Sequence, residues 1–289
     1  MTKRIDELPV VLTCFAYGED YFSELDGMLV TLREHHPGWT IVTGKGPVAG
    51  FELPTLEVES PSGKRHWSLP VSLNLDGNAE NDWRKIVMMK AWWIAQVWHN
   101  FDELADFQPR RIVWIDADAR LGGPLDIELD PEAEVLAGPW WFDPEHPAYE
   151  GVRGGILLFQ GHPQGKVESL MDRWSDKCLA YIQSLPPRVL PWPESDQEAL
   201  NELLRGFPDT TADGVFLKLE HSKYCGHLTK YGASRPGTLL IHWLMSAKMW
   251  LPEDSNMPWP PTEEYRRQIA AESGFPPKVP RDALPDESG

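Results

Sequence analysis

The chain has 289 residues, of which 42% are hydrophobic and 25% are charged, so it is long enough to bury a substantial core as one large domain or two closely joined lobes. A formal net charge of −17 argues against non-specific binding to nucleic acid or to an anionic membrane surface. The three scattered cysteines lack metal-site spacing, and no leader or membrane-length apolar run is recognisable, so we expect a reducing, cytoplasmic setting without a transmembrane anchor.

The first part of the chain predicts a strand, a helix and a second strand. Residues 9–16 are almost wholly apolar, residues 20–35 carry apolar side chains at helical spacing, and residues 39–42 form the next apolar run. Elements of these lengths predict a βαβ unit with parallel strands and a right-handed crossover. Residues 51–80 are rich in turn-forming residues and predict loops, with at most one strand near residues 56–59.

The strongest helical pattern spans residues 82–98, where apolar residues form one stripe. Lys90 projects near the middle of this stripe. A buried, unpaired ammonium is costly, so we expect Lys90 either to meet an anion or to extend its head to water. The helix pattern by itself leaves both outcomes open.

A short apolar run at residues 112–115 predicts a strand that is buried on both faces of a parallel sheet. It is followed by Asp116, Ala117 and Asp118. Because side chains alternate along a strand, the two carboxylates are expected to converge at the strand's carboxyl end, where open α/β sheets bind ligands. Adjacent carboxylates repel one another, which favours a bound cation, and oxygen ligands suit Mg²⁺ or Mn²⁺. A loop with two solvated aspartates is the alternative.

Two further strands are predicted at residues 134–139 and 154–160, and a helix is predicted at residues 167–185. The second strand begins with Gly154 and Gly155. Two glycines at this place either allow the backbone to approach a ligand closely or mark a bend in the strand.

The next predicted helix covers residues 195–204, with Ser195 and Glu198 as a capping box. Asp196 lies in its first turn. A carboxylate there either complements the helix dipole or faces a reacting group, and the sequence alone leaves both readings open.

Late strands are predicted at residues 215–219 and 238–242. His242 ends the second of them, and a lone histidine is by itself more typical of a structural residue than of a ligand. Residues 251–289 are rich in proline and charge, with at most one short helix at residues 262–271.

The order of these motifs resembles that of metal-dependent glycosyltransferases of the GT-A fold, the family-eight-like group that includes glycogenin and bacterial galactosyltransferases. The resemblance spans residues 10–250. It implies an α/β, Rossmann-like fold for nucleotide-diphospho-sugar transfer, with a mostly parallel central sheet flanked by helices. It also implies a single catalytic domain over residues 1–250, with a nucleotide-binding half (1–125) and a sugar and acceptor half (126–250), followed by the tail at residues 251–289.

The resemblance further implies roles for particular residues. Asp116 and Asp118 resemble the DxD motif and His242 the late histidine that completes the metal site, so these three would hold Mn²⁺ or Mg²⁺. Asp196 and Gln197 resemble the catalytic pair beside the anomeric carbon. Residues that would contact the nucleotide or the sugar are, in chain order, Phe15, Ala16, Tyr21, Lys90, Asp116, Ala117, Gly154, Gly155 and Lys248.

The activity that the resemblance implies is hexosyl transfer from a nucleotide-diphosphate sugar, with a UDP-sugar as the expected donor and retention of configuration. The acceptor hydroxyl is not specified, although the net charge disfavours nucleic acid. The chain departs from the family where Arg153 begins the glycine-led strand and where Lys248 replaces a glycine-lysine loop. Two other functions stay open: a phosphatase of the haloacid-dehalogenase type that uses Asp116 and Asp118, and a nucleotide-sugar-binding protein without catalysis.

Overall fold

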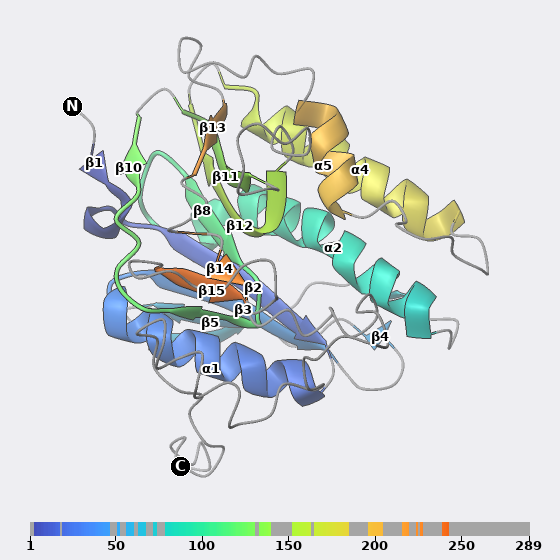
Figure 1. The fold of residues 1–289 in the computed structure, drawn as a ribbon, viewed down its shortest axis with the longest axis horizontal. Helices are drawn as coiled ribbons and strands as arrows, with labels where there is room; N and C mark the ends of the chain where they lie inside the picture. Colours follow the sequence, from blue (N-terminus) through green and yellow to red (C-terminus); the bar gives the residue numbers. More distant parts are fainter. Residues whose placement is uncertain are drawn as a thin grey trace.

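The computed structural model describes residues 3–17, 19–46, 51–52, 56–60, 63–67, 72–73, 79–130, 133–139, 152–162, 165–184, 196–204, 216–219, 224, 226–227 and 239–242. It is a mixed α/β structure with a central sheet between helices (Figure 1). Lys248, the predicted cap at Ser195 and the predicted tail lie outside the described residues. None of the helices in this described part of the chain is long and apolar enough to cross a membrane.

The central sheet has eight strands in the order β13-β11-β12-β8-β2-β3-β5-β6. In that order the strands are Phe216–Lys218, Val135–Pro139, Val152–Gln160, Arg111–Ile115, Val11–Tyr17, Thr40–Gly46, Leu56–Ser60 and Gly63–Trp67. β2 is parallel to β3 and β8, and β11 is parallel to β13, whereas the other four neighbouring pairs are antiparallel. β5 and β12 therefore run against the other six strands, and the predicted mostly parallel sheet is a mixed one.

The predicted βαβ unit is confirmed. α1 (Glu19–His35) connects β2 to β3, and these strands pair in parallel from Val11 opposite Thr40 to Tyr17 opposite Gly46. β2 is mostly apolar and its residues are buried except for the half-buried Phe15 and Tyr17, as expected of a strand between two layers. The helix ends one residue before His36, because the proline that follows His36 disfavours helical geometry at that residue.

Helices cover both faces of the sheet. Figure 1 shows α1 on one face and α2 (Ala79–His99), α4 (Val167–Ser184) and α5 (Asp196–Leu204) together on the other. These three helices match the predicted ones to within a few residues. A one-turn helix, α3 (Phe101–Leu104), follows α2 and was not predicted.

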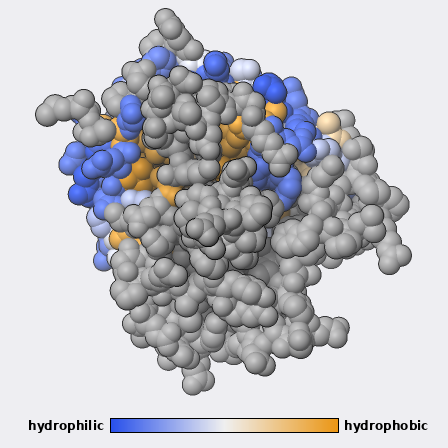
Figure 2. Space-filling view, turned by 45° about the horizontal axis from the view of Figure 1, so that its top comes forward, coloured by the Kyte–Doolittle hydropathy of each residue, from blue (hydrophilic) through white to orange (hydrophobic). Residues whose placement is uncertain are grey.

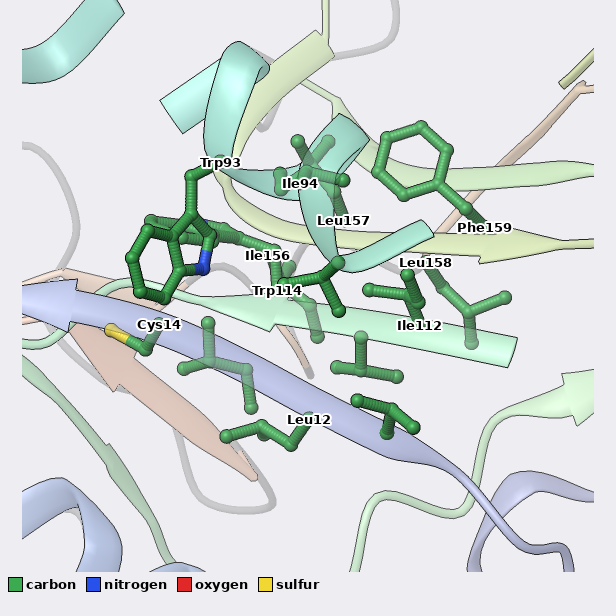
Figure 3. Close-up of a cluster of buried hydrophobic side chains, with 14 of the residues drawn as sticks. Leu12, Cys14, Trp93, Ile94, Ile112, Trp114, Ile156, Leu157, Leu158 and Phe159 are labelled. Atoms are coloured by element: carbon green, nitrogen blue, oxygen red, sulfur yellow. The ribbon is translucent and has the colours of Figure 1, made fainter. Parts of the chain in front are cut away.

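The core lies between α2 and the middle of the sheet (Figure 3). Each fully buried large apolar side chain contributes about 1.5–3 kcal/mol relative to an exposed one, so this cluster holds α2 firmly against the strands. In Figure 2 most of the coloured residues near the edge of the molecule are hydrophilic, and most of the hydrophobic ones lie closer to the middle of the view. The labelled members of the cluster come from β2, α2, β8 and β12: Leu12, Cys14, Trp93, Ile94, Ile112, Trp114, Ile156, Leu157, Leu158 and Phe159.

Short strands form three smaller sheets. β14 (Gly226–His227), β15 (Leu240–His242) and β9 (Ala119–Leu121) form one of them. The other two are pairs, β1 (Lys3–Arg4) with β10 (Glu128–Leu129) and β4 (Phe51–Glu52) with β7 (Ser72–Leu73), and a 3-10 turn covers Ile5–Glu7.

The prediction for residues 51–80 is wrong in part. One strand was expected near residues 56–59, whereas β5 and β6 form an antiparallel hairpin at the end of the central sheet and β4 pairs with β7. Lys64, Arg65 and His66 in β6 are exposed. A strand whose side chains are polar and solvated lacks the apolar alternation on which strand prediction depends.

Candidate active site

The acidic motif lies in a turn directly after β8. β8 ends at Ile115, and β9 begins at Ala119, whose amide donates to the Asp116 carbonyl at 3.1 Å. The amide of Asp116 donates to the Gly155 carbonyl of β12 at 3.0 Å. The side chains of Asp116 and Asp118 therefore do not follow strand alternation, which was the reason for expecting them on one side. Asp118 is buried and the Asp116 side chain is about a third exposed, at 31%.

Lys90 of α2 joins this turn to α5. Its ammonium Nζ lies 3.0 Å from Asp116 Oδ1 and 3.1 Å from Asp196 Oδ2, and it donates to the Gly154 carbonyl oxygen at 3.2 Å. The Trp114 ring centroid lies 5.2 Å from Nζ, within range of a cation–π interaction. Of the two outcomes expected for this buried lysine, the structure shows contact with anions.

The charges of this cluster depend on one another. Burial lowers the pKa of Lys90, but Asp116 and Asp196 together outweigh burial, so its pKa lies above the ordinary lysine value and the side chain is charged. Burial raises the pKa of the Asp196 carboxyl, the charge of Lys90 lowers it, and the neighbouring Asp116 raises it further, so that the pKa lies above its ordinary value. One ammonium thus serves two carboxylates, and a negative charge is left over when both are ionised.

α5 is bonded to the backbone of β12 by side-chain amides. The Gly154 amide donates to Gln197 Oε1 at 3.0 Å, and Asn201 accepts from the Val152 amide at 2.6 Å and donates to the Val152 carbonyl at 3.3 Å. On the other side of α5, Trp174 Nε1 donates to the carbonyl oxygen of Asp196 at 2.7 Å. These bonds place the first turn of α5 beside Lys90.

The two glycines at the start of the predicted strand lie where the register of β12 changes. Ala137 of β11 faces Leu157, whereas the next residue of β11, Gly138, faces Arg153. A β-carbon on Gly154 would lie 3.0 Å from Lys90 Nζ and 3.1 Å from Asp196 Oδ2. The register shift agrees with the predicted bend, and the backbone here lies close to the protein's own charged groups. The close approach to a ligand stays a prediction.

The late histidine is brought next to the acidic motif along the backbone. β15 pairs antiparallel with β9, and His242 lies opposite Ala119, the residue that follows Asp118. The His242 side chain is not among the described ones, so its role as a ligand stays a prediction. Within the described residues, no three His, Cys, Asp or Glu side chains form a group that could hold a metal ion.

The other predicted contact residues lie nearby or within the core. The ring of Phe15 in β2 packs against Trp93 at 5.6 Å and Trp114 at 5.5 Å between centroids, so it belongs to the aromatic cluster beside Lys90. Ala16 is buried and Tyr21 on α1 is half-buried. Ala117 is also buried. A nucleotide contact by any of these four residues stays a prediction.

Sequence reasoning missed two contacts, one within the site and one in the strand that follows the acidic motif. Trp114 Nε1 donates to Asp116 Oδ1 at 2.7 Å, and the spacing of two residues along the chain is the signal that could have suggested it. Arg120 of β9 is buried and forms an ion pair with the buried Glu24 of α1, with Nη2 and Oε2 2.8 Å apart. A β-carbon on Gly27 would collide with this guanidinium, so the helix needs glycine there.

Comparisons with known proteins give no family assignment. No family model matches the sequence, and no curated protein matches it either. One solved structure to which the chain is similar is described as a glycosyltransferase involved in the glycosylation of the major capsid of PBCV-1, with 10% identity, a TM-score of 0.49, and coverage of 82% of this chain and 93% of that one. Similarity at this level is too low to carry an assignment, so function has to be argued from the residues of the site.

Proposed function

We propose that the protein is a metal-dependent glycosyltransferase that moves a hexose from a nucleotide-diphosphate sugar to a hydroxyl acceptor. The observation that carries the proposal is the convergence of Asp116 and Asp196 on Lys90 at the carboxyl end of β8, with β12 backbone at Gly154 in the same cluster. Open α/β sheets bind nucleotide ligands at this end of their strands. The motif order along the chain, which resembles the family-eight-like enzymes, supports the same function.

The acidic groups suit a divalent cation. Among the described residues, the three acids Asp116, Asp118 and Asp196 lie in this part of the site with one ammonium, that of Lys90. Oxygen donors with surplus negative charge fit Mg²⁺ or Mn²⁺. Asp118 and His242 are the proposed ligands, with Asp116 reaching the metal through water or contacting the ribose. When bound, the ion would supply Lewis-acid stabilisation of the departing diphosphate.

The protein's own residues supply orientation and electrostatics. Gly154 lies in β12 against the charged cluster, where the absence of a side chain lets the backbone pack against Lys90 and Asp196. The proposed sugar contacts of Gly154 and Gly155 rest on the family resemblance. Gln197 holds the Gly154 amide and so positions this backbone. The carboxylate of Asp196 would stabilise positive charge that develops on the sugar ring as its bond to the diphosphate breaks.

The burial of Asp196 favours retention of configuration. An inverting transferase needs a general base that reaches the acceptor hydroxyl. The Asp196 side chain is only 3% exposed and is ion-paired to Lys90, so it is poorly placed to take a proton from an acceptor. We therefore propose that transfer retains the configuration of the sugar. A UDP-sugar is the proposed donor, and the proposed contacts of its nucleotide are Phe15, Ala16, Tyr21 and Lys248.

Donor hydrolysis tests this proposal without knowledge of the acceptor. Purified protein is incubated with UDP-hexoses and other nucleotide sugars in Mn²⁺, in Mg²⁺ or in a chelator, and release of the nucleoside diphosphate is measured. We expect hydrolysis of at least one donor that requires the metal and is lost in Asp118→Asn, while the circular dichroism spectrum of that variant is unchanged. Absence of hydrolysis with every donor, or full activity of Asp118→Asn, would contradict the proposal.

The same assay separates the two alternatives. Release of phosphate from a generic phosphate ester such as p-nitrophenyl phosphate would indicate a phosphatase. Metal-dependent nucleotide binding with neither hydrolysis nor transfer would indicate a binding protein. No contact among the described residues favours either alternative over the transferase.

A further inference from the structure

We propose that Lys90 is a positioning residue that sets the relative placement of Asp116 and Asp196 and does not itself bind the donor diphosphate. This inference rests on the proposed function and changes one part of it, since the family resemblance implies that Lys90 contacts the donor.

The Lys90 ammonium is already engaged by three groups inside the protein, because it donates a hydrogen bond to the Gly154 carbonyl and forms ion pairs with Asp116 and Asp196. An ammonium has three N–H donors. Its three nearest acceptors are Asp116 Oδ1 at 3.0 Å, Asp196 Oδ2 at 3.1 Å and the Gly154 carbonyl at 3.2 Å. A phosphate oxygen could bind Nζ only in place of one of these, which would break an ion pair of Lys90 or leave the Gly154 carbonyl without its donor.

The ammonium is also enclosed. The Lys90 side chain is 9% exposed, and the Trp114 ring lies on one side of Nζ. On another side the gap is so small that a single β-carbon on Gly154 would be 3.0 Å from Nζ. A phosphate group is larger than a methyl group and does not fit between the Gly154 backbone and the ammonium.

The contacts of Lys90 join four segments that are distant in sequence. They connect α2, the turn after β8, the bent start of β12 and the first turn of α5. The Asp116 carboxylate is also held from a second direction by Trp114, which donates to Oδ1, and Trp174 holds the backbone of Asp196 by donating to its carbonyl. Lys90 is therefore placed to fix the distance between the carboxylates of Asp116 and Asp196. Transfer needs reacting groups that are aligned in this way.

A stability cycle tests whether Lys90 holds both acids. We compare the urea midpoints of Lys90→Met, Asp196→Asn and the double variant. In Lys90→Met the two carboxylates lie close together without their cation, so the urea midpoint of this variant falls clearly. In the double variant, Asp196→Asn recovers at least half of that loss. In the wild-type background the same Asp196→Asn change shifts the midpoint much less. An equal shift in both backgrounds would overturn the inference.

The cycle stays decisive if Lys90→Met does not fold. In that event the double variant is expected to fold, because it removes the repelling charge. If Asp196→Asn folds and the double variant does not, Lys90 has a different structural role and the inference fails. Lys177→Met is the matched control, since among the described residues Lys177 forms one ion pair, with the exposed carboxylate of Glu202, and its midpoint should change little.

Nucleotide affinity tests whether the diphosphate touches Lys90. Affinities for UDP and UMP in the presence of Mn²⁺ are measured by calorimetry for wild type and Lys90→Met. We expect both affinities to change by the same factor to within about threefold, while kcat for donor hydrolysis falls by about 100-fold, the scale expected for misplaced reacting groups. A loss of about tenfold or more that is confined to UDP, the size of one charge-assisted hydrogen bond, would overturn the inference.

The two proposals fail in different ways. If wild-type protein binds no nucleotide and hydrolyses no donor, the transferase proposal is wrong, and the stability cycle still decides whether Lys90 holds the two acids. If hydrolysis occurs and only UDP affinity suffers in Lys90→Met, the transferase proposal stands and the positioning role is wrong.

Discussion

Replacing Gly154 by alanine is the smallest change that should disturb the charged cluster. The added β-carbon would lie 3.0 Å from Lys90 Nζ, 3.1 Å from Asp196 Oδ2 and 4.0 Å from Gln197 Oε1. A lysine head can usually move aside, but this one is held by three acceptors, so a shift of a few tenths of an ångström has to lengthen at least one of those contacts. The Gly154 backbone does not adopt a positive φ, so any effect would come from the contact and not from backbone strain.

The expected size of the effect follows from two changes. Overpacking lowers the unfolding free energy, and displaced reacting groups lower turnover. Forcing a methyl group into a filled site costs about 1–3 kcal/mol of unfolding free energy. A displacement approaching 1 Å at reacting groups lowers turnover by about 100-fold, so we expect donor hydrolysis by Gly154→Ala to fall by about tenfold to 100-fold. Urea unfolding and metal-dependent donor hydrolysis measure the two effects.

Gly38→Ala is the matched control, because its β-carbon would meet no atom within 4 Å and its φ is not positive. It should leave both stability and hydrolysis within error of wild type. If Gly154→Ala behaves like Gly38→Ala, then the closeness of β12 to Lys90 is not important for the site, and the reasoning about the bent strand is refuted.

Three further predictions concern other buried side chains. Glu24→Gln should lower the unfolding free energy by about 3–5 kcal/mol, because it leaves the buried guanidinium of Arg120 without its anion; a loss below 1 kcal/mol in urea unfolding would contradict the buried pair. Trp114→Phe should cost at least about 1–2 kcal/mol and lower donor hydrolysis, since Asp116 loses a hydrogen-bond donor and the smaller ring fills only part of the space of the buried indole; unchanged hydrolysis would show that this bond does not orient the acid. Burial lowers the pKa of His36 to about 4, below its ordinary value of 6.5, so the stability linked to its neutral form is complete above pH 6.5 and is lost as the pH falls towards 4. His36→Gln should weaken this acid dependence of the urea midpoint, and an unchanged dependence between pH 7 and pH 4.5 would refute it.

Several features of the fold and site follow from local sequence alone. The apolar run before Asp116 predicts β8, because a strand that is buried on both faces is apolar throughout. The helical spacing of residues 82–98 predicts α2, because a period of 3.6 residues reflects which side chains face a core. The same stripe placed Lys90 against the core, so contact with an anion could be expected. The identity of that anion could not be predicted, because Asp116 and Asp196 lie in separate elements and the helical period of α2 indicates neither of them.

Tertiary structure decided what depends on contacts between distant segments. The pairing of β15 with β9, which sets His242 opposite Ala119, arises from backbone hydrogen bonds that leave no pattern in either short strand. The bend of β12 at Gly154 depends on acceptors and donors from α2 and α5, and the hairpin of β5 and β6 has a solvated strand without apolar alternation. Sequence periodicity reports burial along one element, whereas the site is made by the meeting of four elements, and only the folded chain brings one ammonium within reach of two carboxylates.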